Sequence, residues 1–221
     1  MTESAKSRIL DSAERLFARH GFEATSLRAI IVDAKVNLAA VHYYFRSKEG
    51  LIRAVFERRF APVNQERLRL LEACESNKTG RHPTVEQILE AFLLPMVSIG
   101  MSKSRQKANL LQLAGRILLE PGTQFERVVA EQFSEVARRF IEAFQRALPQ
   151  LERSEIAWRL NFTIGAAAKA LFSGVSMQVL AGAAQQQGVE ESDVDQMAHR
   201  LIAYAAAGMK APLLLKRRGS R

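Results

Sequence analysis

Cysteine is nearly absent from this chain of 221 residues, which contains only Cys74. A single cysteine can form no internal disulfide and cannot build a cysteine-based zinc site. Long apolar runs are also missing, because no segment approaches the roughly 18 uninterrupted apolar residues that a transmembrane helix needs. The first ten residues, MTESAKSRIL, lack the apolar stretch of a secretory signal peptide. We therefore expect a cytoplasmic protein that does not enter a membrane.

The motifs of common enzyme classes are missing as well. No Glu-x-x-His pair is present for a di-iron site, and neither a GxSxG motif nor a glycine-rich phosphate-binding loop occurs. The histidines are far apart in the sequence, at His20, His42, His82 and His199. We therefore predict no enzymatic activity, no metal site and no cofactor.

Positive charge is concentrated at the two ends of the chain, whose net charge is +9. Residues 1–60 contain 11 Lys and Arg against 7 Asp and Glu, whereas residues 61–209 contain 16 of each kind. The last twelve residues add five basic side chains and no acidic one. This distribution is expected if an N-terminal unit meets a polyanion. The basic tail, residues 216–221, is either disordered and solvated or makes a further contact.

Apolar residues recur at helical spacing almost everywhere, and no convincing alternation typical of strands is found. We predict an all-α protein of about nine helices. The first is expected near residues 4–20, with Gly21 ending it, and Pro62 interrupts the fourth, which otherwise runs towards Cys74. Capping residues mark the next three starts: Thr25 with Ser26, then Asn37, then Ser47.

The only obvious linker is the polar segment at residues 76–83. Beyond it, Thr84 and Gln87 form a capping-box signal for a helix that Pro95 is expected to kink. Further helices are predicted over residues 107–119, from Thr123 to Leu148, and over residues 154–186 and 192–215. This pattern divides the chain into an N-terminal unit at residues 1–50, a helical domain at residues 51–215 and the tail at residues 216–221.

The segment LAAVHYYFRSK, residues 38–48, indicates what the N-terminal unit does. Two short helices joined by a tight turn, with a third beside them, describe a helix-turn-helix, whose second helix can enter the DNA major groove. Val41 and Phe45 are four residues apart and are expected to point inward, whereas Tyr43 is expected at the surface. We also assign Tyr44 to the core. A basic Lys48 at the start of the next helix suits a phosphate.

At these residues the chain resembles the TetR family of transcriptional regulators. The segment TSLRAIIVDAKVNLAAVHYYFRSKEGLIRAVF is similar to their helix-turn-helix, and the preceding ARHGFEAT resembles the end of their first helix. The resemblance covers residues 8–56. It implies phosphate contacts by Thr25, Ser26, His42, Tyr43 and Lys48. It also implies that four residues face the bases or the groove, namely Asn37, Leu38, Ala39 and Ala40. Arg28 is implied as a further contact.

Two positions depart from the family pattern. The turn carries Lys35 where a glycine is usual, so this lysine must adopt an unfavourable left-handed conformation or the turn must differ slightly. His42 stands where tyrosine is more common, so its phosphate contact could depend on pH.

The resemblance implies that the helical domain dimerises and binds a small effector. Small residues in IGAAAKALFSGV, residues 164–175, and YAAAGM, residues 204–209, favour close helix packing. They are expected either in a homodimer interface of the last two helices or in packing within one chain. A two-fold dimer would address a near-palindromic double-stranded operator.

Aromatic and sulfur-containing side chains in the central helices predict an apolar effector pocket. Arg116 and Arg159 lie in apolar surroundings, where either could meet a ligand carboxylate or pair with Glu120, Glu126 or Glu155. The full candidate set is Phe92, Met96, Arg116, Phe125, Phe133, Phe140, Phe144, Trp158, Arg159 and Phe162.

The segments RRFIEAFQRALPQL, AWRLNF and GAAAKALFSG resemble the branch of the family that responds to fatty acids and acyl-CoA. This resemblance implies a small hydrophobic effector, with an acyl chain as one candidate. We therefore interpret the sequence as a ligand-responsive repressor that its effector releases from DNA. The alternative is a helical protein-binding scaffold without sequence-specific DNA binding.

Overall fold

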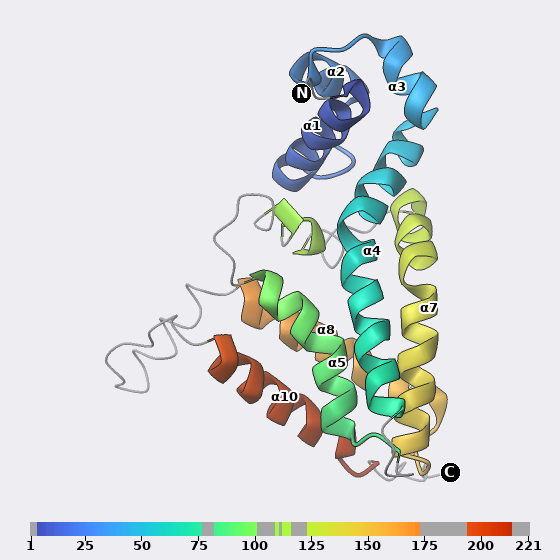
Figure 1. The fold of residues 1–221 in the computed structure, drawn as a ribbon, viewed down its shortest axis with the longest axis vertical. Coiled ribbons are helices and arrows are strands. Elements are labelled where there is room, and N and C mark those ends of the chain that lie inside the picture. Colours follow the sequence, from blue (N-terminus) through green and yellow to red (C-terminus); the bar gives the residue numbers. More distant parts are fainter. Residues whose placement is uncertain are drawn as a thin grey trace, which may run out of the picture.

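The structure is a computed structural model that describes residues 4–76, 82–100, 109–110, 112–115, 123–172 and 194–213. The predicted all-α class is confirmed, because every regular element within these ranges is a helix. Figure 1 shows α1, α2 and α3 grouped at one end and longer helices forming the rest. The bounds are α1 Ala5–His20, α2 Leu27–Ala34, α3 Leu38–Phe45, α4 Lys48–Glu75, α5 Val85–Gly100, α7 Thr123–Ala147, α8 Arg153–Phe172 and α10 Val194–Lys210.

Parts of some predicted elements lie outside the described residues. They include most of the helix predicted over residues 107–119, of which residues 109–110 and 112–115 are helical, and the far end of the helix predicted over residues 154–186. The tail at residues 216–221 is also outside them. None of the helices in the described ranges is long and apolar enough to cross a membrane.

Helices α2, α3 and α4 begin at predicted capping residues, and Ser4 caps α1 in the same way. The side-chain oxygens of Ser4, Ser26, Asn37 and Ser47 each accept a hydrogen bond from the backbone N–H three residues ahead, at 3.2, 3.1, 2.9 and 3.0 Å. Each cap satisfies one of the N–H groups that a helix start leaves unpaired, and such a cap contributes about 1 kcal/mol. The capping box of α5 is also confirmed, because Thr84 and Gln87 exchange hydrogen bonds of 2.9 and 3.3 Å.

The predicted interruption of α4 at Pro62 is wrong, because this helix is continuous over 28 residues. Proline has no N–H, so the carbonyl of Arg58 loses its helical hydrogen bond. Pro62 is exposed, and water can satisfy a carbonyl on that face of the helix. The proline therefore weakens α4 locally without ending it.

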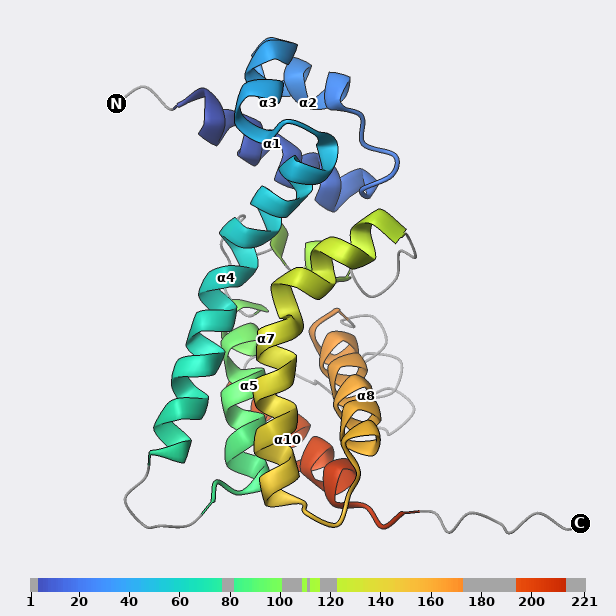
Figure 2. The same cartoon turned by 90° about the vertical axis from the view of Figure 1, so that its right-hand side faces the viewer.

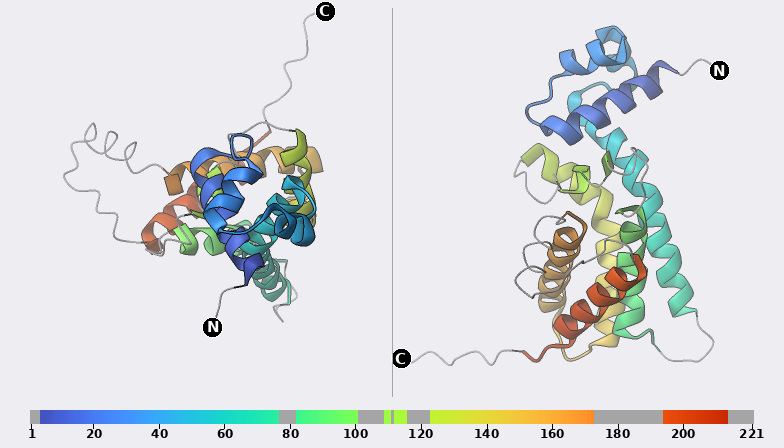
Figure 3. Two further views of the ribbon diagram at one scale, coloured as in Figure 1. Left: turned by 90° about the horizontal axis from the view of Figure 1, so that it is seen from above. Right: turned by 90° about the vertical axis from the view of Figure 1, so that its left-hand side faces the viewer.

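Two hydrophobic cores share α4. The head core joins α1, α2 and α3 to the first half of α4, through Val63, and includes Val128 of α7. The body core joins α5, α7, α8 and α10 to the end of α4, beginning at Leu71. Figure 2 shows α4 and α7 running side by side from the head towards the far end of the molecule. The right view of Figure 3 shows α10 lying across α5.

Ion pairs fix the head on α4. The carboxylate of Glu14 in α1 is 2% exposed and accepts hydrogen bonds from Arg58 at 2.7 Å and Arg59 at 2.6 Å. Arg58 also pairs with Asp11 at 2.6 Å. Removing one partner from such a buried pair leaves an uncompensated charge, which is strongly destabilising. This cluster therefore holds α1 at a fixed position along α4.

Arg159 of α8 holds the end of α10. Its side chain is 8% exposed, and its Nε donates to Glu155 at 2.7 Å. Its Nη1 donates to the carbonyls of Met209 and Ala211 at 2.8 and 2.6 Å. These are carbonyls that a helix end leaves without partners. The predicted pairing with Glu155 is confirmed, and these bonds tie the Arg159 side chain to the end of α10. Its assignment to an effector pocket stays a prediction.

We predict that Arg159→Met lowers the free energy of unfolding by about 2 to 3 kcal/mol, since it removes buried charge-assisted hydrogen bonds. Urea denaturation followed by circular dichroism measures the change. Arg153→Met is the matched control, because Arg153 is 62% exposed and only pairs with Glu142 at 3.6 Å. Equal stability of the two variants would contradict the capping role.

Candidate nucleic-acid interface

The turn between α2 and α3 is built around Lys35. This residue has φ 52° and ψ 51°, so it adopts the left-handed conformation, which is one of the two alternatives left open by the sequence. Its N–H donates to the carbonyl of Val32 at 3.2 Å, and Val36 N–H donates to Ile31 at 3.1 Å. These two bonds close a Schellman motif, in which glycine is usual at the left-handed position. The turn is therefore the expected one, made with an unfavourable residue.

Hydrogen bonds between α1 and α2 set the position of α2. The Ser12 hydroxyl donates to Asp33 at 2.6 Å, and Arg15 pairs with the same carboxylate. The hydrogen bond from Ser12, together with Arg15, lowers the pKa of Asp33. Asp33 is therefore charged at neutral pH and binds α2 to the first helix.

Helix α3 has a buried face and an exposed face. Val41 and Phe45 are 0% and 6% exposed in the head core, as predicted. On the other side, Tyr43 is 81% and Leu38 is 46% exposed. Ala39 and His42 are also exposed, whereas Ala40 is half-buried. The exposed face therefore carries the aliphatic side chains of Leu38 and Ala39 at its start and the aromatic ring of Tyr43 towards its end.

Tyr44 does not belong to the core, contrary to the prediction. Its side chain is 40% exposed, and its ring lies edge-on against Tyr43 with centroids 5.0 Å apart. The ring sits at the side of α3 that faces α1, where core packing is incomplete. Two tyrosine hydroxyls are consequently available at this end of α3.

Thr25 is also placed differently from the prediction. Its side chain is 3% exposed, and its hydroxyl donates to the carbonyl of Gly21 at 2.7 Å. A hydroxyl has one hydrogen to donate, and here that hydrogen is used inside the protein. The expected phosphate contact by the Thr25 side chain is therefore wrong, and Thr25 instead holds the link between α1 and α2.

Ser26 and Asn37 are both exposed caps at the starts of α2 and α3. The Ser26 oxygen accepts from the N–H of Ala29, so the hydroxyl hydrogen stays available as a donor. Arg28, two positions further on, is also exposed. These side chains lie at helix N-termini, where an anion is favoured.

Lys48 and His42 are both tied to nearby carbonyls. The Lys48 ammonium donates to the carbonyl of Glu23 at 3.2 Å and has two further hydrogens to donate. The Nδ1 of His42 lies 3.0 Å from the carbonyl of Arg46, so Nδ1 carries a proton in this geometry. The other nitrogen, Nε2, can then donate to a phosphate only when the ring is cationic.

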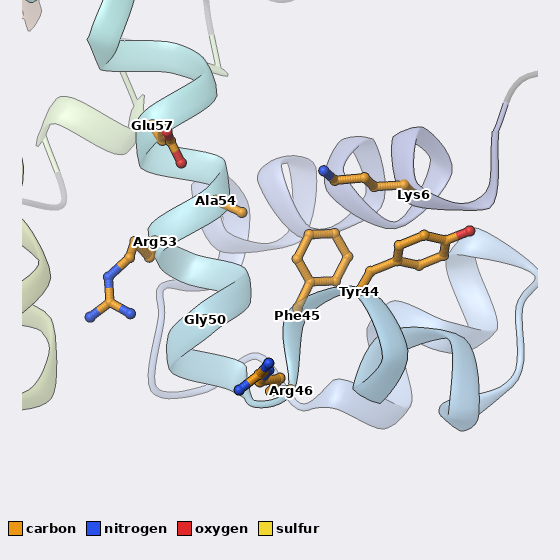
Figure 4. Close-up of a pocket in the computed structure, with 8 residues that line it drawn as sticks. All are labelled: Lys6, Tyr44, Phe45, Arg46, Gly50, Arg53, Ala54 and Glu57. Carbon is orange, nitrogen blue, oxygen red and sulfur yellow. The ribbon is translucent and has the colours of Figure 1, made fainter.

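A hollow of about 210 Å³ opens between α1, α3 and α4 beside the exposed face. Figure 4 shows Lys6 of α1 lying alongside Tyr44 and Phe45, with Arg46 at the start of the link to α4. Gly50 permits this arrangement, because a Cβ there would lie 2.1 Å from the carbonyl oxygen of Phe45. The sequence interpretation missed Lys6 and Arg46. Arg46 directly follows the aromatic run, whereas Lys6 comes beside it only through the packing of α1.

The predicted effector residues do not form one pocket in the described part of the chain. Phe140 and Phe144 are fully buried in the body core, and Phe92 is 5% exposed. Met96 and Phe133 pack instead at the edge of the head core.

Trp158 and Phe162 are wrong as pocket residues, because they are 60% and 65% exposed on α8. Arg116 and the side chain of Phe125 lie outside the described residues.

The head consists of three helices, of which α3 is capped at its start and exposed on one face. This arrangement defines the class of helix-turn-helix DNA-binding proteins. Residues 9–55 match the family described as "Bacterial regulatory proteins, tetR family". Residues 90–208, more than half of the chain, match "Tetracyclin repressor-like, C-terminal domain". The chain belongs to the TetR family of transcriptional regulators, which are not enzymes.

Two curated relatives match part of the chain. "Probable HTH-type transcriptional regulator YttP" of Bacillus subtilis is 36% identical over 90 residues, which are 41% of either chain. The nicotine-responsive repressor HdnoR of Paenarthrobacter nicotinovorans is 30% identical over 97 residues, covering 44% of this chain and 48% of that one. The alignments thus span less than half the length of these relatives.

Solved structures share the fold over nearly the whole chain. The fatty acid degradation regulator FadR from Bacillus halodurans has a TM-score of 0.65 at 13% identity, covering 96% of this chain and all of that chain. HlyIIR, a hemolysin II transcriptional regulator, has a TM-score of 0.59 at 20% identity, covering 90% and 96%. These identities establish the common fold alone.

We predict that Lys35→Gly raises the free energy of unfolding by about 0.5 to 1 kcal/mol, because glycine adopts the left-handed conformation without steric cost. Lys35→Ala is the control, since it removes the same charge but keeps the strained backbone. Urea denaturation of both variants measures the effect. A gain in the alanine variant equal to that in the glycine variant would show that charge, not conformation, is responsible.

Proposed function

We propose that this protein is a homodimeric repressor that binds a near-palindromic double-stranded operator and leaves it when a small hydrophobic effector binds the body. The observation that carries the proposal is the exposed face of α3. An exposed surface of small residues and tyrosine, on a helix whose opposite face is fully buried, suits contact with a groove.

The structure supports dividing the DNA contacts between bases and phosphates. Small side chains at the start of α3 let the backbone approach base edges, while hydroxyl, imidazole and ammonium groups around them suit phosphates. We assign the groove to Asn37, Leu38, Ala39 and Ala40. We assign the phosphates to Ser26, Arg28, His42, Tyr43 and Lys48, with Lys6 and Arg46 extending the basic surface.

An exposed apolar face on α8 and α10 supports the homodimer. Trp158 and Phe162 lie one turn apart on α8, with ring centroids 5.8 Å apart, and Tyr204 of α10 is 71% exposed. A Cβ added at Gly165 or Gly208 would meet no atom within 4 Å, so these positions have room for close helix approach. Large exposed apolar side chains gathered on adjacent helices mark an interaction surface. We propose that this face pairs with its copy in a four-helix interface.

We place the effector in the body, whose core includes the end of α4. An apolar interior of aromatic side chains suits a hydrophobic ligand, and an acyl chain is our candidate. Related proteins are named for different chemistry, since HdnoR is called nicotine-responsive and FadR is called a fatty acid degradation regulator. In the proposed mechanism, the effector favours a second arrangement of the body, and α4 carries the change to the head.

We predict that replacing both Tyr43 and Lys48 by alanine weakens operator binding about tenfold or more, since two phosphate contacts are lost. Loss of Lys48 also lowers the dependence of log K on log salt by about one unit. Fluorescence anisotropy on the DNA flanking the protein's own gene measures both effects. The control is Arg138→Ala on α7, which is 56% exposed and distant in the chain. Undiminished binding by a folded double variant would remove these residues from the interface.

We predict that Phe162→Glu combined with Tyr204→Glu converts the dimer to a monomer, because burying two carboxylates in the interface is costly. Light scattering after size-exclusion chromatography measures the mass. Val32→Glu is the control, since Val32 is a 71% exposed apolar residue on α2, away from the proposed interface. An unchanged dimer would place the interface elsewhere.

A further inference from the structure

The buried face of α4 is interrupted by two polar residues. The apolar positions Phe60 and Val63 belong to the head core, and Leu71 belongs to the body core. Between them lie Asn64 and Arg67, each only 7% exposed. We call these two side chains the polar seam. The seam therefore lies on α4 where one hydrophobic core gives way to the other.

Hydrogen bonds of the polar seam reach three helices. The Nε of Arg67 donates to the carbonyl of Phe92 in α5 at 2.8 Å, and its Nη1 donates to Asn64 at 3.2 Å. The amide of Asn64 donates in turn to the carbonyl of Gln132 in α7 at 3.1 Å. The Arg67 guanidinium also lies over the Phe92 ring, with its carbon 4.5 Å from the centroid. The seam thus joins α4, α5 and α7.

Arg67 is buried without a carboxylate. The other buried charged side chains of the described residues are paired, Glu14 with two arginines and Arg159 with Glu155. No residue that the structure describes forms an ion pair with Arg67. Burial lowers the pKa of Arg67 to about 10, so the group is still charged at neutral pH. A buried cation balanced only by dipoles is costly to the folded protein.

The guanidinium also has donors left over. Arginine carries five N–H groups, and the contacts above use one on Nε and one on Nη1. The remaining group is a planar fork, which matches a carboxylate better than any neutral ligand. The Phe92 ring and its neighbour Phe140, with centroids 5.0 Å apart, are buried beside it in the body core.

We propose that Arg67 binds the anionic end of the effector, so the effector is a small apolar carboxylate. This inference rests on the proposed function, because it places that effector in the body. The negative charge of the effector then compensates the positive charge of Arg67, at the place where α4 passes from the head core to the body core. In this proposal, Arg67 takes the carboxylate-binding role for which the sequence offered Arg116 and Arg159. The rival explanation is purely structural, with Arg67 holding α4 to α5 through the Phe92 carbonyl and orienting Asn64 towards α7.

The experiment compares matched acids and amides on three forms of the full chain. The probes are decanoate, 4-phenylbutyrate and salicylate, each beside its primary amide, and the forms are wild type, Arg67→Met and Arg69→Met. Arg69 is the control, because it lies on the same helix but is 63% exposed and pairs with Glu66 at 2.7 Å. Thermal shift measures binding.

We expect at least one acid to raise the melting temperature of wild type and Arg69→Met, with no rise from its amide. In Arg67→Met the affinity for that acid falls about tenfold or more, since one charged contact is lost. The proposal is overturned if no acid shifts wild type, if the amide binds equally, or if Arg67→Met keeps the shift.

Two further measurements separate folding and DNA binding from this result. Ligand-free Arg67→Met should melt no lower than wild type, because methionine removes an uncompensated buried charge; a lower melting temperature without lost acid binding would support the structural rival. If Arg67→Met does not fold, Arg67→Lys replaces it, and equal binding of acid and amide to that variant overturns the proposal. Failure of wild type to bind operator would overturn the proposed function while the acid assay still tests Arg67.

Discussion

The structure depends on one continuous helix that belongs to two hydrophobic cores. Helix α4 supplies Val63 to the head core and Leu71 to the body core. Because packed interiors resist small displacements, a movement of α4 in one core must be accommodated in the other. The pairs of Arg58 and Arg59 with Glu14 prevent α1 from sliding along α4. The head and the body are therefore joined through one shared helix.

Local rules predicted the head well, since its helices begin and end through contacts between residues close in sequence. Ser26, Asn37 and Ser47 cap helices by accepting from N–H groups three residues away, and such spacing is visible in any sequence. At Lys35 the sequence left open a left-handed residue or a different turn, and the structure has the left-handed one in a Schellman motif. The prediction that Pro62 interrupts α4 was wrong, because packing on both sides of the proline keeps this helix intact.

Surface residues of the site were predictable only where helical spacing determines the exposed face. Tyr43 lies opposite Val41 and Phe45 on α3, whereas the exposure of Tyr44 depends on how closely α1 packs beside it. The Thr25 side chain is buried and donates a hydrogen bond to the carbonyl of Gly21, a contact that no spacing rule requires. In the body, aromatic composition could not separate core from surface, because Phe140 and Phe162 have the same chemistry on different helix faces. Tertiary packing decided between them.

The most direct test of the account is a footprint of the purified protein on the DNA flanking its own gene, at physiological salt with excess competitor DNA. The account predicts protection of two inverted half-sites whose centres are about one helical turn apart, or a multiple of it. Binding of this kind requires a dimer, an exposed α3 and a fixed relation between head and body. Affinity no greater than that for random DNA, with no protected half-sites, would contradict the account and favour a helical scaffold.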